Sequence, residues 1–269
     1  MALHVEITGD QNAPAIVFLH GGGISGWMWN RQVAAFADYC CLVPDLPEHG
    51  KSINEQPMTI ADSADRIADL IRNNAAGRKA HIIGHSIGAK IIVEILSRHP
   101  EVVDHAVIVS ALFRPIPFLK ILCNRSAYKS TILMLKSKRL LAYQVKQFGF
   151  KCKEDQQHLT DDFRRLTVDR LDHIYGELYK HLELPKNLKN AAAPALIIAG
   201  EREPAAMHES VQLLASALPN AKGILLRNCK HDIPWRTADS FNRIIREWLN
   251  DKPLIDDEIL SIKLPVTLR

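Results

Sequence analysis

One pentapeptide, Gly-His-Ser-Ile-Gly at residues 84–88, constrains the chain more than any other segment. It follows an apolar run at residues 80–83, typical of a buried parallel strand, and precedes residues 89–96, whose composition predicts a buried helix. A serine at such a strand-to-helix turn takes a strained backbone conformation that pushes its hydroxyl outwards. Only small residues fit two positions away on either side, and the two glycines of the pentapeptide stand there. The segment therefore predicts a nucleophilic Ser86 on a sharp turn rather than a chance match.

The rest of the chain alternates apolar runs with amphipathic segments, apart from one long interruption. This alternation predicts an α/β core with a mostly parallel central sheet flanked by helices. A helix capped by Thr59 should bury a stripe that begins at Ile60. We expect the core to consist of residues 1–111 and 191–250. Strands are expected at residues 3–8, 15–19, 40–43, 80–83, 106–109, 194–200 and 223–226, and further helices at 29–37, 207–218 and 237–249.

The interruption covers residues 112–190, which contain no convincing buried strand and predict an inserted helical subdomain. One helix is expected over residues 132–148, with an apolar and a basic face. Thr160 is expected to cap a second helix, which Pro185 would end.

Charge is unevenly distributed along the chain, whose net charge is +4. Between Asp104 and Glu154 there is no acidic residue but there are ten Lys or Arg, whereas the remaining residues comprise 24 basic and 30 acidic ones. The basic segment is either a solvated helical face or a surface that attracts an anionic substrate or an acidic partner. No nucleic-acid-binding pattern appears, and aromatic residues are sparse.

Cysteine usage and the N-terminus favour a cytoplasmic location. The five cysteines show neither a disulfide framework nor metal-ligand spacing, and no basic region precedes an apolar one at the N-terminus. No apolar run reaches membrane-spanning length. No His, Cys and carboxylate cluster has metal-ligand spacing either, so we expect no metal and no cofactor.

A second motif, His-Gly-Gly-Gly at residues 20–23, follows the predicted strand 15–19. Its glycines let backbone N–H groups point into a cavity. Together with residues 45–52, the pentapeptide, an acid after Gly200 and a histidine before the last helix, this motif resembles the α/β-hydrolase superfamily over nearly the whole chain. The resemblance implies a sheet of about seven strands here and a cap formed by residues 112–190.

The resemblance also implies a catalytic triad in the order Ser86, Glu203, His231. His231 would take the proton of Ser86, and Glu203 would orient and stabilise the imidazole. Glu201 is the rival for the acid, and Glu203 is favoured because it stands where the family's acid usually stands.

The resemblance further implies an oxyanion hole formed by the N–H groups of Gly22 and Ile87. Two positions depart from the family pattern, since Glu replaces the commoner Asp and Lys230 replaces the glycine that usually precedes the histidine. Lys230 would narrow the pocket or lower the pKa of His231. We interpret the other histidines as structural or surface groups, among them His49, His85, His105 and His208.

The expected function is hydrolysis of an ester or related acyl bond in a small or medium, partly apolar substrate, which would be anionic if the basic segment attracts it. A carbon–carbon bond hydrolase with the same triad is the enzymatic alternative. A small-ligand receptor that retains the triad is the alternative from another class, and cofactor-free oxygen chemistry is disfavoured.

The tail at residues 251–269 is too apolar for a simple disordered end. An acidic run at residues 256–258 precedes a partly alternating stretch at 259–266, as in an edge strand. The tail is therefore expected to pack on its own domain or on a second subunit, with its acidic run touching the basic segment. A frayed terminus is the alternative, and a dimer through the cap or the tail stays open.

Overall fold

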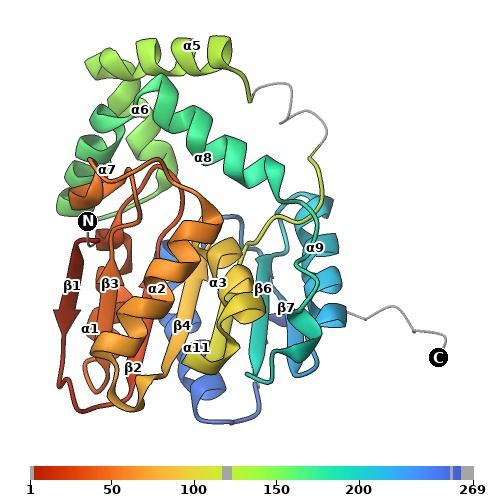
Figure 1. Ribbon diagram of the computed structural model, residues 1–269. Helices are drawn as coiled ribbons and strands as arrows, with labels where there is room; N and C mark the ends of the chain where they lie inside the picture. Colours follow the sequence, from red (N-terminus) through yellow and green to blue (C-terminus); the bar gives the residue numbers. More distant parts are fainter. Residues whose placement is uncertain (1–2, 117–122, 255–256, 262–269) are drawn as a thin grey trace.

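The computed structural model describes residues 3–116, 123–254 and 257–261. Within these residues one sheet of eight strands has the order β1-β3-β2-β4-β5-β6-β7-β8 (Figure 1). Strands β2 to β7 pair in parallel, and the two edge strands β1 and β8 are antiparallel to their neighbours. The strand bounds are β1 Val5–Thr8, β2 Ala15–Leu19, β3 Cys40–Pro44, β4 Ala80–His85, β5 Val103–Val109, β6 Ala195–Gly200, β7 Ala221–Leu226 and β8 Ile259–Ser261.

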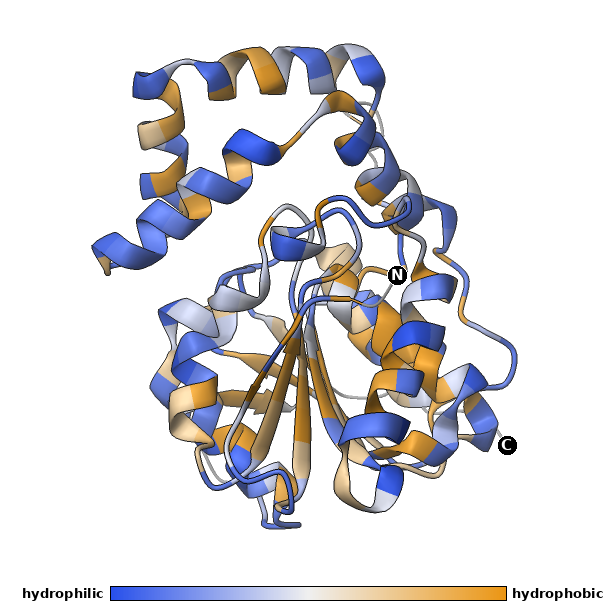
Figure 2. Ribbon diagram, turned by 60° about the vertical axis from the view of Figure 1, so that its left-hand side comes forward, coloured by the Kyte–Doolittle hydropathy of each residue, from blue (hydrophilic) through white to orange (hydrophobic). Residues whose placement is uncertain are grey.

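Helices cover both faces of the sheet, and their outer surfaces are hydrophilic while the strands between them are apolar (Figure 2). Val17 and Leu19 of β2 join the core beneath α2, α3 and α9, whereas Ile16 and Phe18 join the core beneath α1, α10 and α11. Strands buried on both faces in this way read as continuous apolar runs, which is why the sequence revealed them. The helix bounds are α1 Asn30–Ala35, α2 Ile60–Asn74, α3 Ile87–Arg98, α9 Ala205–Ala217, α10 Ile233–Arg236 and α11 Ala238–Leu249.

Helix α2 begins at Ile60, directly after the predicted cap Thr59. Thr59 has extended backbone angles, and its side chain accepts a hydrogen bond from Asp62 N at 3.1 Å. Such a cap stabilises a helix by about 1 kcal/mol. The predicted apolar stripe is buried, and it comprises Ile60, Ala64, Ile67, Ala68 and Ile71.

In the described part of the chain between β5 and β6, four α-helices lie over the end of the sheet at which the parallel strands finish (Figure 1). We call them the helical insertion, and they are α5 Arg125–Lys136, α6 Lys138–Phe148, α7 Lys153–Arg165 and α8 Val168–Lys180. The predicted single helix over residues 132–148 is wrong. Ser137 has an extended ψ of 117° and separates α5 from α6, so the chain turns there.

The predicted cap at Thr160 is also wrong. Thr160 lies inside α7, and its hydroxyl donates to Gln156 O at 2.7 Å, one turn earlier. Threonine can satisfy its hydroxyl in this way within a helix, so its presence does not by itself mark a start. The true cap is Thr167, which has extended backbone angles and accepts from Arg170 N at the start of α8.

A buried ammonium group ties the helical insertion to α3. Lys90 Nζ donates to the carbonyl oxygens of Leu112, Leu178 and His181 at 3.1, 2.9 and 2.5 Å. The side chain of Lys90 is only 2% exposed, and burial lowers its pKa to about 7. Glu177 of α8 adds a further link by accepting from Ile60 N at 2.9 Å.

A second polar anchor holds α7. The carboxylate of Asp162 accepts from Ser25 N at 2.9 Å, from Ser25 Oγ at 2.8 Å and from Trp27 Nε1 at 2.7 Å. Three donors from one short segment of the core therefore meet one carboxylate of the insertion. Burial raises the pKa of Asp162, and these donors oppose that shift.

The tail contributes the eighth strand. β8 pairs antiparallel with β7, with Ile259 opposite Leu226, so the expectation of about seven strands was one short. Packing of the tail on its own domain is thus confirmed for residues 259–261. Glu258 O accepts from Arg227 N at 2.8 Å, which places this part of the acidic run beside the core. Residues 255–256 and 262–269, Asp256 included, lie outside the described residues.

No helix in the described ranges is both long and apolar enough to cross a bilayer.

Candidate active site

Ser86 occupies a strained turn between β4 and α3. Its φ of 56° and ψ of −113° lie outside the usual range for a residue with a side chain, which costs of order 1–3 kcal/mol. A Cβ on Gly84 would lie 2.7 Å from the backbone of Gly88, and one on Gly88 would lie 2.4 Å from Leu19 O. The close approach of three backbone segments therefore requires both glycines, as the sequence predicted.

An imidazole and a carboxylate meet at the ends of the neighbouring strands. His231 Nδ1 lies 2.6 Å from Glu203 Oε1. The other carboxylate oxygen of Glu203 accepts from Ser110 Oγ and from Gly200 N, both at 2.9 Å. Burial alone would raise the pKa of Glu203, but the hydrogen bonds from His231, Gly200 and Ser110 hold it below its usual value. An anionic Glu203 keeps the proton of His231 on Nδ1 and leaves Nε2 free to accept another.

The rival acid, Glu201, has a different partner. Its carboxylate accepts from Asn228 N at 2.7 Å, in the loop that leads from β7 to His231. Asn228 has a φ of 59°, and Arg202 Nη2 also donates to its side chain at 2.7 Å. Glu201 thus helps to hold the loop, whereas Glu203 contacts the imidazole itself.

All five residues predicted for the site line one cavity of about 360 Å³ at the carboxyl ends of the parallel strands. They are Gly22, Ser86, Ile87, Glu203 and His231. Most of the remaining wall is apolar, and the helical insertion supplies part of it. The contributions of the insertion include Phe148, Ile174, Tyr175 and Leu178. Among the described residues that line the cavity there is no Lys or Arg.

A second cavity of about 370 Å³ lies between α7 and the N-terminal part of the core. Acidic groups contribute to its wall, among them Asp45, Asp161 and Asp162, and none of the five predicted site residues does. Volume alone therefore does not distinguish the two cavities, whereas the five predicted site residues all line the first one.

The glycine loop after β2 is packed from two sides. A Cβ on Gly22 would lie 2.7 Å from Ile174 Cγ2 of α8, and one on Gly21 would lie 3.0 Å from His85 Nδ1. Gly23 has a φ of 76°, and its N–H donates to His49 Nε2 at 3.0 Å. A side chain at Gly22 would therefore displace Ile174 of the insertion, and one at Gly23 would strain a backbone of positive φ.

Two neutral histidines, His20 and His49, pack beside the glycine loop and bond to backbone groups. His20 Nε2 accepts from Leu46 N at 2.9 Å, and the His20 ring lies 4.9 Å from that of His49. Burial lowers the pKa of His20 to about 4 and that of His49 to about 3. Each ring can then accept one backbone N–H and donate its own, as a neutral imidazole does. The interpretation of His49 as a structural group agrees with these contacts.

His85 has a larger part in the site than the sequence indicated. It lines the cavity, its Nε2 lies 2.8 Å from His231 O, and the two rings are 4.6 Å apart. Burial and the neighbouring His231 lower the pKa of His85 well below its usual value. A neutral His85 can donate from Nε2 to the backbone carbonyl of His231 and so support its loop. The one available signal was its position directly before Ser86.

Lys230 does not narrow the cavity in the described part of the chain. Its side chain is exposed and does not contribute to the wall. The contacts of the described residues include the bond between His231 and Glu203 but no hydrogen bond from Ser86 Oγ to His231. Catalytic hydrogen bonds are often long in the absence of substrate and tighten when it binds.

The model of the alpha/beta hydrolase family matches residues 16–244, so this chain belongs to the alpha/beta hydrolase family. It is 26% identical over 275 residues to the 2-hydroxy-6-oxononadienedioate/2-hydroxy-6-oxononatrienedioate hydrolase of Cupriavidus pinatubonensis, a match that covers 93% of this chain and 91% of that protein. It is 34% identical over 110 residues to carboxylesterase YbfK of Bacillus subtilis, covering 40% of this chain and 37% of the relative.

Similarity to solved structures agrees with this assignment of the fold. The enol-lactonase from Burkholderia xenovorans superposes with a TM-score of 0.68 at 21% identity, covering 92% of this chain and 96% of that one. The chain is thus an enzyme with the alpha/beta hydrolase fold, and the relatives named here are hydrolases of more than one bond type.

Proposed function

We propose that this enzyme hydrolyses esters of small or medium, apolar and uncharged acyl groups through the triad Ser86, His231 and Glu203. One observation carries the proposal: these three residues share a single cavity with the predicted oxyanion-hole residues, and the rest of its wall is largely apolar. We further propose that the helical insertion acts as the cap, because α6 and α8 complete that wall.

In the proposed reaction Ser86 Oγ attacks the ester carbonyl carbon while His231 Nε2 takes its proton. Glu203, which lies 2.6 Å from the other ring nitrogen, stabilises the imidazolium that forms. Collapse of the tetrahedral intermediate breaks the bond to the alcohol, which receives the proton from His231. Water then attacks the acyl-enzyme with His231 as base, and this step releases the acid and restores Ser86.

The negative charge on the tetrahedral oxygen would be stabilised by the N–H groups of Ile87 and Gly22. Ile87 is the first residue of α3, and an N–H at that position has no partner within the helix. It also lies at the positive end of the helix dipole. The N–H of Ser86, by contrast, is already bonded to Val109 O at 2.8 Å. Loss of one oxyanion-hole donor typically raises the barrier by ~3 kcal/mol.

The wall of the cavity favours an uncharged acyl group. A substrate carboxylate would leave water for a wall in which the described residues provide no Lys or Arg. His85 offers no positive charge, because its pKa is lowered well below its usual value. The apolar side chains from α6 and α8 suit an alkyl or aryl group instead.

Carbon–carbon bond hydrolysis is the second candidate, and the similarity over 93% of the chain to a hydrolase of that type favours it. The name of that relative specifies a dioate substrate, which carries two carboxylates. The described wall offers such a substrate no cationic partner, and for this reason we place ester hydrolysis first.

The test uses p-nitrophenyl esters of increasing acyl length, a fluorophosphonate label, and the Ser86→Ala variant. Ser130→Ala is the matched control, since Ser130 is exposed on α5. We expect the parent and the control to be labelled and active, and Ser86→Ala to lose roughly 10⁴-fold or more in kcat/KM. Equal labelling of the Ser86→Ala variant would exclude Ser86 as the nucleophile.

A 1,5-diketone substrate separates the two candidates, because its hydrolysis breaks a carbon–carbon bond. A higher kcat/KM for a dicarboxylate diketone than for every ester would favour the second candidate. Labelling of Ser86 without measurable turnover of either class would instead favour a receptor that retains the triad.

A further inference from the structure

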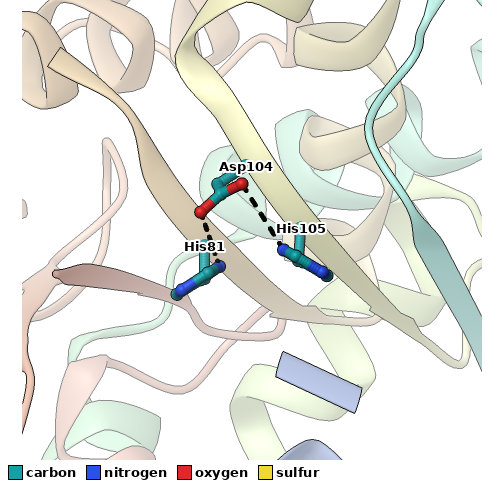
Figure 3. Close-up of side chains that lie close together, drawn as sticks. All are labelled: His81, Asp104 and His105. Carbon is teal, nitrogen blue, oxygen red and sulfur yellow. Dashed lines mark ion pairs between the residues drawn. The ribbon is translucent and has the colours of Figure 1, made fainter. Parts of the chain in front are cut away.

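Three side chains with metal-binding atoms lie close together (Figure 3). They lie where β4 and β5 begin, at the end of the sheet opposite to Ser86. His81 lies near the start of β4, and Asp104 and His105 are consecutive residues near the start of β5. Consecutive residues of a strand normally point to opposite faces. Here the pairing shifts between residues 80 and 82 of β4, so that two residues of β5 oppose His81, as in a β-bulge. The shift brings Asp104 beside both imidazoles.

The distances within this cluster approach those of a metal site. Asp104 Oδ2 lies 3.6 Å from His81 Nδ1, and Asp104 Oδ1 lies 3.5 Å from His105 Nδ1. One ligand atom from each residue can be chosen so that all three lie within 4.8 Å of one another. Ligand atoms around tetrahedral Zn²⁺ stand about 3.3 Å apart, given bonds of about 2.0–2.1 Å. Small side-chain rotations would therefore close the site.

The Nδ1 atoms of His81 and His105 are buried but have no hydrogen-bond partner among the described residues. His81 is 6% exposed and His105 is 9% exposed, and neither Nδ1 has a hydrogen bond within the described part of the chain. Buried polar atoms almost always have a partner, and an atom without one requires an explanation such as an ion. The two unpartnered nitrogens are the same atoms that face the carboxylate of Asp104.

We propose that His81 Nδ1, His105 Nδ1 and the carboxylate of Asp104 bind one Zn²⁺ ion, a site separate from the catalytic cavity. Zn²⁺ takes nitrogen and oxygen ligands of this kind, often with three from the protein and water as the fourth. The side chain of Asp104 is 55% exposed, which gives water access to the fourth position. Ca²⁺ and Mg²⁺ prefer sets of oxygen ligands and fit this cluster poorly.

The surroundings of the cluster support a bound metal. Asp251 Oδ1 lies 3.4 Å from His105 Nε2, so a carboxylate faces the nitrogen that would not hold the ion. A metal-binding histidine usually donates its other N–H to such a group, which leaves the binding nitrogen unprotonated. The rings of Tyr39 and Trp248 pack against His81 and His105 with centroids 5.9 and 6.4 Å apart.

The position of the cluster indicates a stabilising role rather than a catalytic one. Four residues of β4 lie between His81 and Ser86, and the five steps along the strand span about 16 Å when extended. The ion would instead link the start of β4 to the start of β5, and Asp251 would add the turn that follows α11. An ion that binds only the folded protein raises its stability.

The experiment titrates the full chain, first freed of metal with a chelator, with ZnCl₂ and separately with CoCl₂. Tetrahedral Co²⁺ absorbs visible light far more strongly than octahedral Co²⁺, so its spectrum reports the geometry of the site. The variants are Asp104→Asn, His105→Ala and Asp251→Asn. The control is His158→Ala, because His158 lies 3.9 Å from Glu154 and the described residues offer no third ligand there.

We expect one equivalent of Co²⁺ with strong visible absorption in the parent and in His158→Ala. Asp251→Asn should weaken Zn²⁺ binding about 10- to 100-fold, as loss of an outer partner does, and the other two variants should weaken it more. Unchanged ester hydrolysis by Asp104→Asn would show that this variant is folded. Zn²⁺ binding equal to that of the parent in Asp104→Asn and His105→Ala, or Co²⁺ bound without strong absorption, would overturn the proposal.

Discussion

The α/β core and the helical insertion are held in place by different forces. Helix α3 of the core buries nine of its 12 residues, whereas α7 of the insertion buries one of 13, Leu159. Polar groups make important contacts from the insertion to the core, among them Lys90, Asp162 and the pair of His173 Nδ1 with Glu48 Oε1 at 2.9 Å. Close packing of many buried side chains resists displacement of the backbone, whereas a region with few buried side chains and some polar contacts opens locally at lower cost. The core is therefore suited to fixing the reacting groups, and the insertion to adjusting the wall around the substrate.

The largest expected effect is on kcat, because the proposed reacting groups lie in the core. Glu203→Gln should lower kcat by roughly 10⁴-fold, because the amide cannot hold the imidazole in the required tautomer or stabilise its charge. Glu201→Gln should cost less than about 10-fold, since Glu201 acts on the loop through Asn228. Steady-state kinetics of both variants check this, and the reverse ranking would move the acid to Glu201.

The next effect tests whether the two regions differ in cooperativity. Ile108→Ala removes a fully buried side chain from β5 and should lower the free energy of unfolding by about 2–5 kcal/mol. Leu159→Ala removes an equally buried side chain from α7, but should mainly increase hydrogen exchange in α5 to α8. Chemical denaturation and native-state hydrogen exchange measure the two responses. Equal loss of protection in the sheet after Leu159→Ala would show that the regions unfold as one.

A pH effect of intermediate size should arise in the core. The unfolded chain takes up protons on His20 and His49 as the pH falls below about 6.5, but the folded protein resists this until about pH 4 or below. The free energy of unfolding should therefore fall as the pH is lowered through this window, by roughly 3 kcal/mol for His20 alone. Urea denaturation at several pH values measures the slope. Replacement of the half-exposed His158 by Gln is the control. A stability that does not change with pH would contradict the lowered pKa values of His20 and His49.

The smallest effect concerns the basic segment. Arg125 already pairs with Asp169 and Asp172, and no described cation of this segment lines the cavity. We therefore expect kcat/KM for a neutral ester and for an anionic analogue to change equally little, less than about twofold, between about 0.05 and 0.5 M salt. A fall confined to the anionic analogue would instead show that the segment steers substrate.

The parts of the molecule that could be predicted from sequence are those encoded locally. The buried strands have continuous apolar runs, and the turn at Ser86 requires small neighbours at fixed spacing, so both left a pattern in the chain. The helix start at Thr167 was missed because Thr160 offers the same side chain seven residues earlier. Local sequence alone does not say which threonine has extended backbone angles.

Features formed by distant segments could not be predicted. His81 and His105 are 24 residues apart, and only the pairing of β4 with β5 and the shift in its register bring them together. The contact of His85 Nε2 with His231 O depends in the same way on a loop that is distant from His85 in sequence. The eighth strand was not among the seven counted, although residues 259–266 partly alternate as in an edge strand, and β8 forms within that stretch.

The three carbonyl groups around Lys90 bear on how such an enzyme can be redesigned. Leu112 stands where the chain leaves the core and His181 where it returns, so one ammonium group joins both crossings to the helix that begins after Ser86. An exchange of everything between these two points would leave the junctions unchanged, provided that the substitute presents a carbonyl where Leu178 does. The segment between Leu112 and His181 could then be exchanged as one unit to alter substrate preference, while the reacting groups keep their positions in the core.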